Sequence, residues 1–168
     1  MRKWLIVWVW YFMLLIMNGC GVYSFTGASI SPEIKSVSIA YFQNRASIMQ
    51  PSLSQVFTEK MKDKFVSQTN LTLIKSSGDL QFYGFISDYN TAPTAIQGNE
   101  QAALNRLTIS VSVKFVNTKD EKQNFETTFS RFADYDSRTN LASVEQDLIS
   151  EICNQLVDDI FNKAVINW

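Results

Sequence analysis

The fold of this chain is decided by residues 106–117, which read RLTISVSVKFVN. Apolar and polar residues alternate through the stretch: Leu107, Ile109, Val111, Val113 and Phe115 against Thr108, Ser110, Ser112 and Lys114. A period of two puts alternate side chains on opposite faces of an extended chain. The stretch therefore predicts a β-strand with one face in the core and the other facing water or a partner.

The neighbouring segments predict strands that pair with this one. Residues 118–122 read as a charged turn, and residues 123–134 as a returning strand with bulky Phe125, Phe129 and Phe132, which together predict a hairpin. Residues 80–89 predict an earlier strand with apolar side chains on both faces. Residues 90–105 between them read as a long loop, and such loops tend to be functional or mobile.

Two stretches have helical periodicity. The first helix is expected from Ser52, at capping-box spacing from Gln55, to about residues 68–70. The second is expected from about Ser143, at the same spacing from Gln146, to the C-terminal region. Its acidic residues are expected to form a plain solvated face: Glu145, Asp147, Glu151, Asp158 and Asp159. Its Cys153 lies on the apolar stripe, which favours a small buried residue over a reactive thiol.

Two further strands, at residues 35–42 and 71–75, complete the set of elements. Their order predicts an α+β fold with two helices packed on one face of a mixed, mostly antiparallel sheet of four to five strands. The other face of the sheet would remain open. It would present Thr108, Ser110, Ser112, Lys114 and Arg131 to a sugar-phosphate, to the wall of a barrel, or only to water.

The N-terminal region has the layout of a secretory signal peptide. Arg2 and Lys3 precede an apolar run at residues 4–17, which is shorter than the roughly 20 residues that a transmembrane helix needs. Residues 16–20, IMNGC, resemble a bacterial lipobox, although Met17 replaces the usual leucine and Asn18 is larger than usual. We expect cleavage between Gly19 and Cys20 and lipid on the Cys20 thiol. An uncleaved anchor, or an ordinary signal with a chance cysteine, are the alternatives.

Lipidation would define three regions and a location. Residues 1–19 would be the signal peptide, 20–34 a lipidated tether and 35–168 a single domain. Several acyl chains anchor a protein stably to a bilayer. The residue after Cys20 is Gly21 rather than aspartate, which favours the outer membrane, and no acidic cluster follows, which favours the periplasmic side.

Composition excludes several classes of function. The chain has no histidine, so it can form neither a Ser-His-Asp triad nor the commonest metal site. Without the signal peptide, 13 basic and 16 acidic residues remain, which is not the basic excess of a nucleic-acid-binding protein. If Cys20 is acylated, Cys153 has no partner for a disulfide within the chain. We therefore expect no enzyme activity, no metal and no cofactor.

Several segments together resemble the LptE-like lipoproteins, in particular their Bacteroidetes-type branch. The similar segments are residues 20–27 (CGVYSFTG), 29–32 (SISP), 78–80 (GDL), 105–109 (NRLTI) and 160–168 (IFNKAVINW). The resemblance implies a non-enzymatic protein with two helices on a sheet, lying partly within the lumen of an LptD β-barrel in the outer membrane. Together the two proteins would place lipopolysaccharide in the outer leaflet.

Family members are implicated in binding lipopolysaccharide through basic residues. No family motif identifies those positions here, so Arg106, Lys114 and Arg131 are candidate lipopolysaccharide or barrel contacts from sheet geometry alone. The rival function is a lipoprotein pilot or accessory subunit of another outer-membrane machine, and a lipid-anchored enzyme is a third. Co-purification distinguishes the first two, because an LptE-like protein should retain a very large barrel and a pilot should retain a secretin or another pore.

Overall fold

The structure, a computed structural model, describes residues 30–94 and 104–165. The predictions for the signal peptide, for Gly19 and Cys20, and for residues 95–103 therefore lie outside the described residues. The described elements are β1 (Ser36–Ile39), β2 (Gln43–Asn44), α2 (Leu53–Gln68), β3 (Thr72–Ile74), β4 (Leu80–Thr94), β5 (Leu104–Asn117), the 3-10 helix η1 (Glu121–Gln123), β6 (Phe125–Asp136) and α3 (Leu141–Val165).

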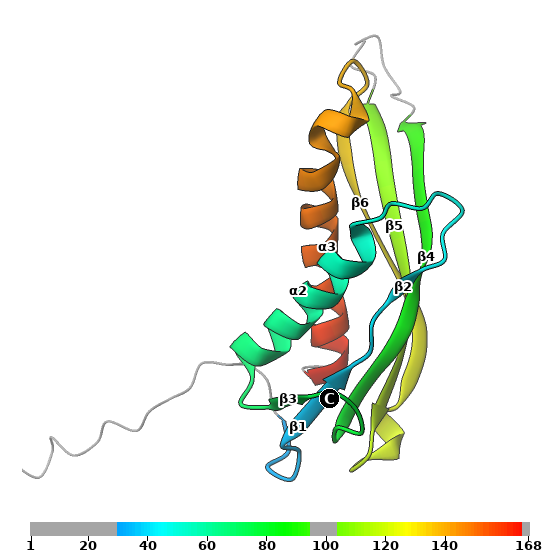
Figure 1. Cartoon of the computed structure of the whole chain (residues 1–168). Helices are drawn as coiled ribbons and strands as arrows, with labels where there is room; N and C mark the ends of the chain where they lie inside the picture. Colours follow the sequence, from blue (N-terminus) through cyan, green and yellow to red (C-terminus); the bar gives the residue numbers. More distant parts are fainter. Residues whose placement is uncertain (1–29, 95–103, 166–168) are drawn as a thin grey trace, which may run out of the picture.

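The architecture confirms the predicted α+β class. Both helices lie on one side of a single mixed sheet (Figure 1). The strand order is β3-β1-β4-β5-β6, with parallel pairing of β1 to β3 and β4, and antiparallel pairing along β4, β5 and β6. The two-residue β2 also pairs with β4, farther along the strand than β1.

The central hairpin is longer than its sequence pattern predicts. Residues 90–94 and 104–105 belong to β4 and β5, because the antiparallel ladder continues to the pair Thr94 and Leu104. The prediction of a loop was therefore wrong for these residues. Their polar composition indicated a loop, but cross-strand backbone hydrogen bonding extends the strands where side-chain alternation has ended.

A chain of aromatic side chains joins the helices to the sheet. Phe65 of α2 contacts Phe82 of β4, with ring centroids 4.7 Å apart, and Phe161 of α3 at 5.0 Å. Phe82 continues the contacts to Phe115, which is 4.8 Å away on β5. Because Phe65 links both helices and the sheet, we expect the packing of the two helices to depend on it.

Gly84 allows an especially close approach in the middle of β4. A Cβ atom at this position would lie 2.1 Å from the carbonyl oxygen of Ser112 and 2.5 Å from the Phe42 ring. Phe42 is fully buried and packs against Phe57 of α2, with ring centroids 5.0 Å apart. The absence of a side chain at Gly84 therefore makes room for a contact between the loop after β1 and α2.

The helix starts differ from the two predicted capping boxes. Ser52 makes no side-chain capping bond to α2, and its backbone N–H donates to Gln50 at 2.8 Å. Helix α3 begins at Leu141, where the Asn140 side chain accepts from the Ala142 N–H at 3.0 Å. Gln146 instead donates to the Ser52 hydroxyl at 3.1 Å. Both capping-box predictions were wrong, and Gln146 joins the starts of the two helices.

The acidic residues of α3 are not a plain solvated face. Glu145 accepts from the buried Tyr89 hydroxyl, Asp158 pairs with Lys64 of α2 at 2.7 Å, and Asp159 pairs with Arg131 of β6. Burial, and then the hydrogen bond to Glu145, raise the pKa of Tyr89. The prediction was therefore wrong for three of the five residues, because they fasten α3 to its neighbours.

Cys153 is fully buried on α3, which confirms the prediction of a small core residue. Burial raises the pKa of its thiol to about 12, so the reactive thiolate is disfavoured near neutral pH. In the described ranges, 30–94 and 104–165, no helix is both long and apolar enough to cross a membrane.

Candidate functional site

The candidate site is the sheet surface of β4, β5 and β6 that faces away from the helices. Strand register defines it, because residues paired across an antiparallel sheet lie on the same face. We call it the open face. Its cross-strand rows are Tyr83, Lys114 and Glu126; Phe85, Ser112 and Thr128; Asp88, Ser110 and Ser130; Asn90, Thr108 and Phe132; and Ala92, Arg106 and Asp134.

Large aromatic side chains stand on the open face beside the hydroxyl groups. Tyr83 is 42% exposed and Phe132 is 47% exposed. The Arg106 guanidinium lies 3.6 Å from the centroid of the Phe132 ring, and that of Arg45 lies 4.6 Å from the centroid of Phe85. The face thus combines aromatic surface, hydroxyl groups and cations, which can contact a sugar, a phosphate or a protein wall.

Two of the five charged side chains in the rows of the open face, Arg106 and Asp134, form an ion pair. Arg106 donates from Nε and Nη2 to the two carboxylate oxygens of Asp134, at 2.7 and 2.8 Å. This hydrogen bonding raises the pKa of Arg106 and lowers that of Asp134. The side chain of Lys114 makes no hydrogen bond or ion pair with any residue that the structure describes. Lys114 is therefore better placed than Arg106 to meet an external anion.

Arg131 does not lie on the open face. It pairs with Ile109 in the β5–β6 register and so faces α3, where it donates to both oxygens of Asp159 at 2.5 and 2.7 Å. The prediction of an open-face Arg131 was wrong. Arg131 is two residues from Phe129, so it shares the helix-facing side of β6, whereas Phe132 lies on the open face.

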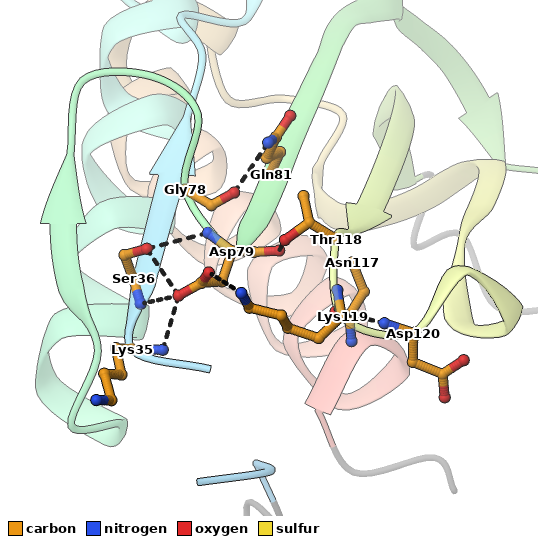
Figure 2. Close-up of polar contacts among 9 residues, drawn as sticks. All are labelled: Lys35, Ser36, Gly78, Asp79, Gln81, Asn117, Thr118, Lys119 and Asp120. Carbon is orange, nitrogen blue, oxygen red and sulfur yellow. Dashed lines mark hydrogen bonds and ion pairs between the residues drawn. The ribbon is translucent and has the colours of Figure 1, made fainter. Parts of the chain in front are cut away.

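A second polar cluster surrounds Asp79, at the end of the sheet near β1 (Figure 2). Its carboxylate accepts from the backbone N–H of Lys35 at 2.9 Å and of Ser36 at 3.1 Å, and from the Ser36 hydroxyl at 3.0 Å. Lys119 pairs with the other oxygen at 3.3 Å. The Lys35 N–H, followed by the other donors, lowers the pKa of Asp79 to about 2 against the opposing effect of burial.

This cluster gives a structural role to the segment GDL at residues 78–80. A Cβ atom at Gly78 would lie 2.7 Å from the backbone nitrogen of Ser38, so only glycine fits this close approach. The Asp79 carbonyl accepts from the Thr118 N–H at 2.9 Å, which ties the same turn to the end of β5. Because the chain's own groups occupy Asp79, the cluster is a clamp between β1 and β5 rather than a ligand site.

We expect Asp79→Asn to lower the free energy of unfolding by about 1–2 kcal/mol near pH 7, because it loses a charge-assisted acceptor. The folded-state pKa is depressed, so this stabilisation is complete above the ordinary value of 3.8 and is lost as pH falls through about 2. The difference between parent and variant should therefore shrink on acidification in urea unfolding. The exposed Asp63→Asn is the matched control, and an unchanged difference at low pH would contradict this account.

The sequence pattern does not predict this clamp, since only the tertiary fold brings Lys35, Asp79 and Lys119 together. The pattern does predict that Lys114 and Arg106 share the open face, because strict alternation fixes the faces of β5. In residues 30–94 and 104–165, no group of three or more histidine, cysteine, aspartate or glutamate residues is arranged to hold a metal ion.

Comparison with known proteins gives one family and a recurrent fold. The family model LptE, described as lipopolysaccharide-assembly, matches residues 34–164. No curated protein matches the chain by sequence. Among solved structures, a minor lipoprotein from Acinetobacter baumannii is 13% identical, with a TM-score of 0.51, over 78% of this chain and 92% of that one.

Two further structures share the fold at low identity. The hypothetical protein CT253 from Chlamydia trachomatis is 11% identical, with a TM-score of 0.53, over 80% of this chain and 99% of that one. A neuraminyllactose-binding hemagglutinin homolog from Helicobacter pylori is 9% identical, with a TM-score of 0.52, over 84% of this chain and 88% of that one. At such identities the likeness shows the fold alone.

Proposed function

Because this chain belongs to the LptE lipopolysaccharide-assembly family, we propose that it is a non-enzymatic outer-membrane lipoprotein that plugs an LptD-type β-barrel. In this role it would help place lipopolysaccharide in the outer leaflet. The observation that supports the proposal most is the extent of the family match. Residues 34–164 include both described helices almost entirely and every described strand.

The proposed anchor fits the proposed location. Removal of residues 1–19 would leave Cys20 to bear the lipid, with residues 20–34 as the tether and 35–168 as the domain. A chain spans at most about 3.6 Å per residue, so the ten residues from Cys20 to Ile30 reach no farther than about 36 Å. The domain would then remain close to the periplasmic surface of the outer membrane, within reach of the barrel lumen.

The open face is the surface proposed to meet the lumen wall or the lipid. Helices α2 and α3 cover the other side of the sheet and are fastened to it and to each other by polar contacts. On the open face, the exposed Tyr83 ring lies opposite Lys114, which forms no ion pair with a described residue although Glu126 lies opposite it on β6. An ammonium group of this kind binds phosphate strongly when the contact is partly desolvated.

We expect the double variant Tyr83→Glu with Lys114→Glu to weaken association with the barrel and binding of lipopolysaccharide by at least about tenfold, since two negative charges would enter a desolvated contact. Both side chains are exposed, but the new carboxylates would lie in one row with Glu126, so the free energy of unfolding should fall by about 1 kcal/mol while unfolding stays cooperative. Co-purification yield and lipopolysaccharide binding in detergent are the measurements, alongside thermal unfolding.

The matched control is Lys62→Glu with Val66→Glu on α2, which introduces the same charges at one lysine and one exposed hydrophobic residue on the helical side. Val66 is 53% exposed and Lys62 is paired only with Glu59, one turn away. This control should retain both the barrel and the lipid. If both double variants bind like the parent, the open face is only a solvated surface.

A further inference from the structure

Strand β6 presents a long, unpaired backbone edge. It is the last strand in the order β3-β1-β4-β5-β6, and its twelve residues pair only with β5. Within the described part of the chain, the one backbone hydrogen bond to β6 outside the β5 ladder runs from the Thr139 N–H to the Asp136 carbonyl, at the end of the strand. Half of the backbone donors and acceptors along about 40 Å of strand are therefore free to pair.

The free edge of β6 lacks most of the features that usually protect such edges, although it carries charged side chains, including Arg131 on the helix side. Its sequence, FETTFSRFADYD, contains no proline, glycine or lysine, and its register with β5 continues without a bulge. Natural sheets normally block exposed edges with short strands, bulges, prolines or lysines, since an open edge invites another strand. The length and regularity of β6 thus favour strand addition rather than prevent it.

The second free edge of the same sheet gives an internal comparison. Beyond β2, residues 87–94 of β4 have no described strand on their side away from β5. That edge carries a register shift between Ile86 and Asp88, and it contains Pro93. A bulge and a proline both disfavour further pairing. The two long free edges of the sheet therefore differ. The edge of β3, the strand at the other end of the described order, is only three residues long, so β6 is the described edge that combines length with an unbroken register.

We propose that β6 is an acceptor edge to which an extended segment of the barrel partner adds as a further antiparallel or parallel strand. The proposal rests on the proposed function for the identity of the partner. A polypeptide is the matching ligand, because only an extended backbone repeats donors and acceptors at the spacing of β6. Strands in the wall of a closed barrel have no free edge, so the segment comes from a barrel loop or terminus.

Side chains beside the edge define the chemistry of the added segment. Arg131, Asp134 and Asp136 are already paired with Asp159, Arg106 and Arg138. Glu126 is exposed and forms no ion pair with a described residue; Lys114 lies opposite it on β5, and its other side faces the free edge. The added strand therefore places a lysine or arginine beside Glu126, at the end of β6 next to η1.

Residue-resolved hydrogen exchange tests this inference on the lipidated protein, alone and co-purified with the barrel in detergent. In β6, the amides that point away from β5 should exchange at least about tenfold more slowly in the complex. Because neighbouring amides point in opposite directions, the new protection should fall on every second residue. The same measurement on residues 87–94, whose inner amides already pair with β5, is the internal control and should show no added protection in the complex.

A charge reversal gives a second readout. Glu126→Lys should weaken the complex about three- to tenfold, whereas Glu121→Lys, an exposed glutamate in η1, should leave it unchanged. If the barrel co-purifies and β6 gains no alternating protection, the strand-addition inference is wrong and the proposed function stands. Protection of the outward β6 amides that already occurs in the protein alone, and rises with its concentration, would assign the edge to a second copy and overturn the inference. If no barrel co-purifies, both proposals fail.

Discussion

Replacing Phe65 with alanine is expected to lower the free energy of unfolding by about 3–5 kcal/mol, the range for removing a buried phenylalanine side chain. Phe65 is fully buried and touches Phe82 and Phe161, with ring centroids 4.7 and 5.0 Å away. Its loss would leave a cavity where α2, α3 and the sheet meet, and their backbones cannot close it without disrupting other contacts. Urea unfolding should show the loss as a lower midpoint with an unchanged slope.

The adjacent residue is the matched control for this prediction. Val66 is 53% exposed on the same helix, so Val66→Ala should change the free energy of unfolding by no more than about 0.5 kcal/mol. Comparable effects of the two substitutions would mean that α2 does not pack on the sheet as described. A loss below about 1 kcal/mol for Phe65→Ala would contradict its central place in the core.

Replacing Cys20 with alanine is expected to abolish acylation and to block cleavage after Gly19. The reason is chemical: the thioether to the lipid needs the thiol, and the lipobox-like segment IMNGC supplies no other nucleophile of that kind. The variant should accumulate as the longer precursor. Labelling with a palmitate analogue, followed by gel electrophoresis and membrane fractionation, measures both effects.

Cys153→Ala is the control for the lipid experiment, since it removes the only other cysteine. The Cys153 thiol is fully buried in the folded domain, so this variant should be labelled like the parent. Equal labelling of the parent and Cys20→Ala would show that Cys20 is not the lipid attachment site. The tether at residues 20–34 would then have no anchor of the proposed kind.

Periodicity explains why the main elements were predictable from sequence. The alternation of residues 106–117 and the apolar stripes of the helices both predict side chains that are buried on one side only. The structure confirms both, because these apolar side chains lie between the sheet and the helices. The paired lengths of β4 and β5 were not predictable in the same way. Residues 90–94 are held by backbone hydrogen bonds to β5. A pattern of side chains cannot predict such bonds.

The candidate site was predictable only where one strand's alternation was strict. Lys114 and Arg106 were placed correctly because β5 keeps its period, whereas Arg131 was misplaced because aromatic residues occur on both faces of β6. The Asp79 clamp joins residues more than 40 positions apart in the sequence. The ion pair of Arg131 with Asp159 likewise joins two different elements, β6 and α3. Contacts of this kind follow from the tertiary structure and have no local signal.

The central claim is that this chain works as the plug of an LptD-type barrel. The most direct measurement is purification of an affinity-tagged, lipidated form from detergent-solubilised outer membranes, with mass spectrometry of the proteins that remain bound. The account predicts a very large β-barrel protein of the LptD type in near-equimolar amount, retained by the parent and reduced at least about tenfold with Tyr83→Glu and Lys114→Glu. Recovery of a secretin or another pore in its place, or of no barrel at all, would contradict it.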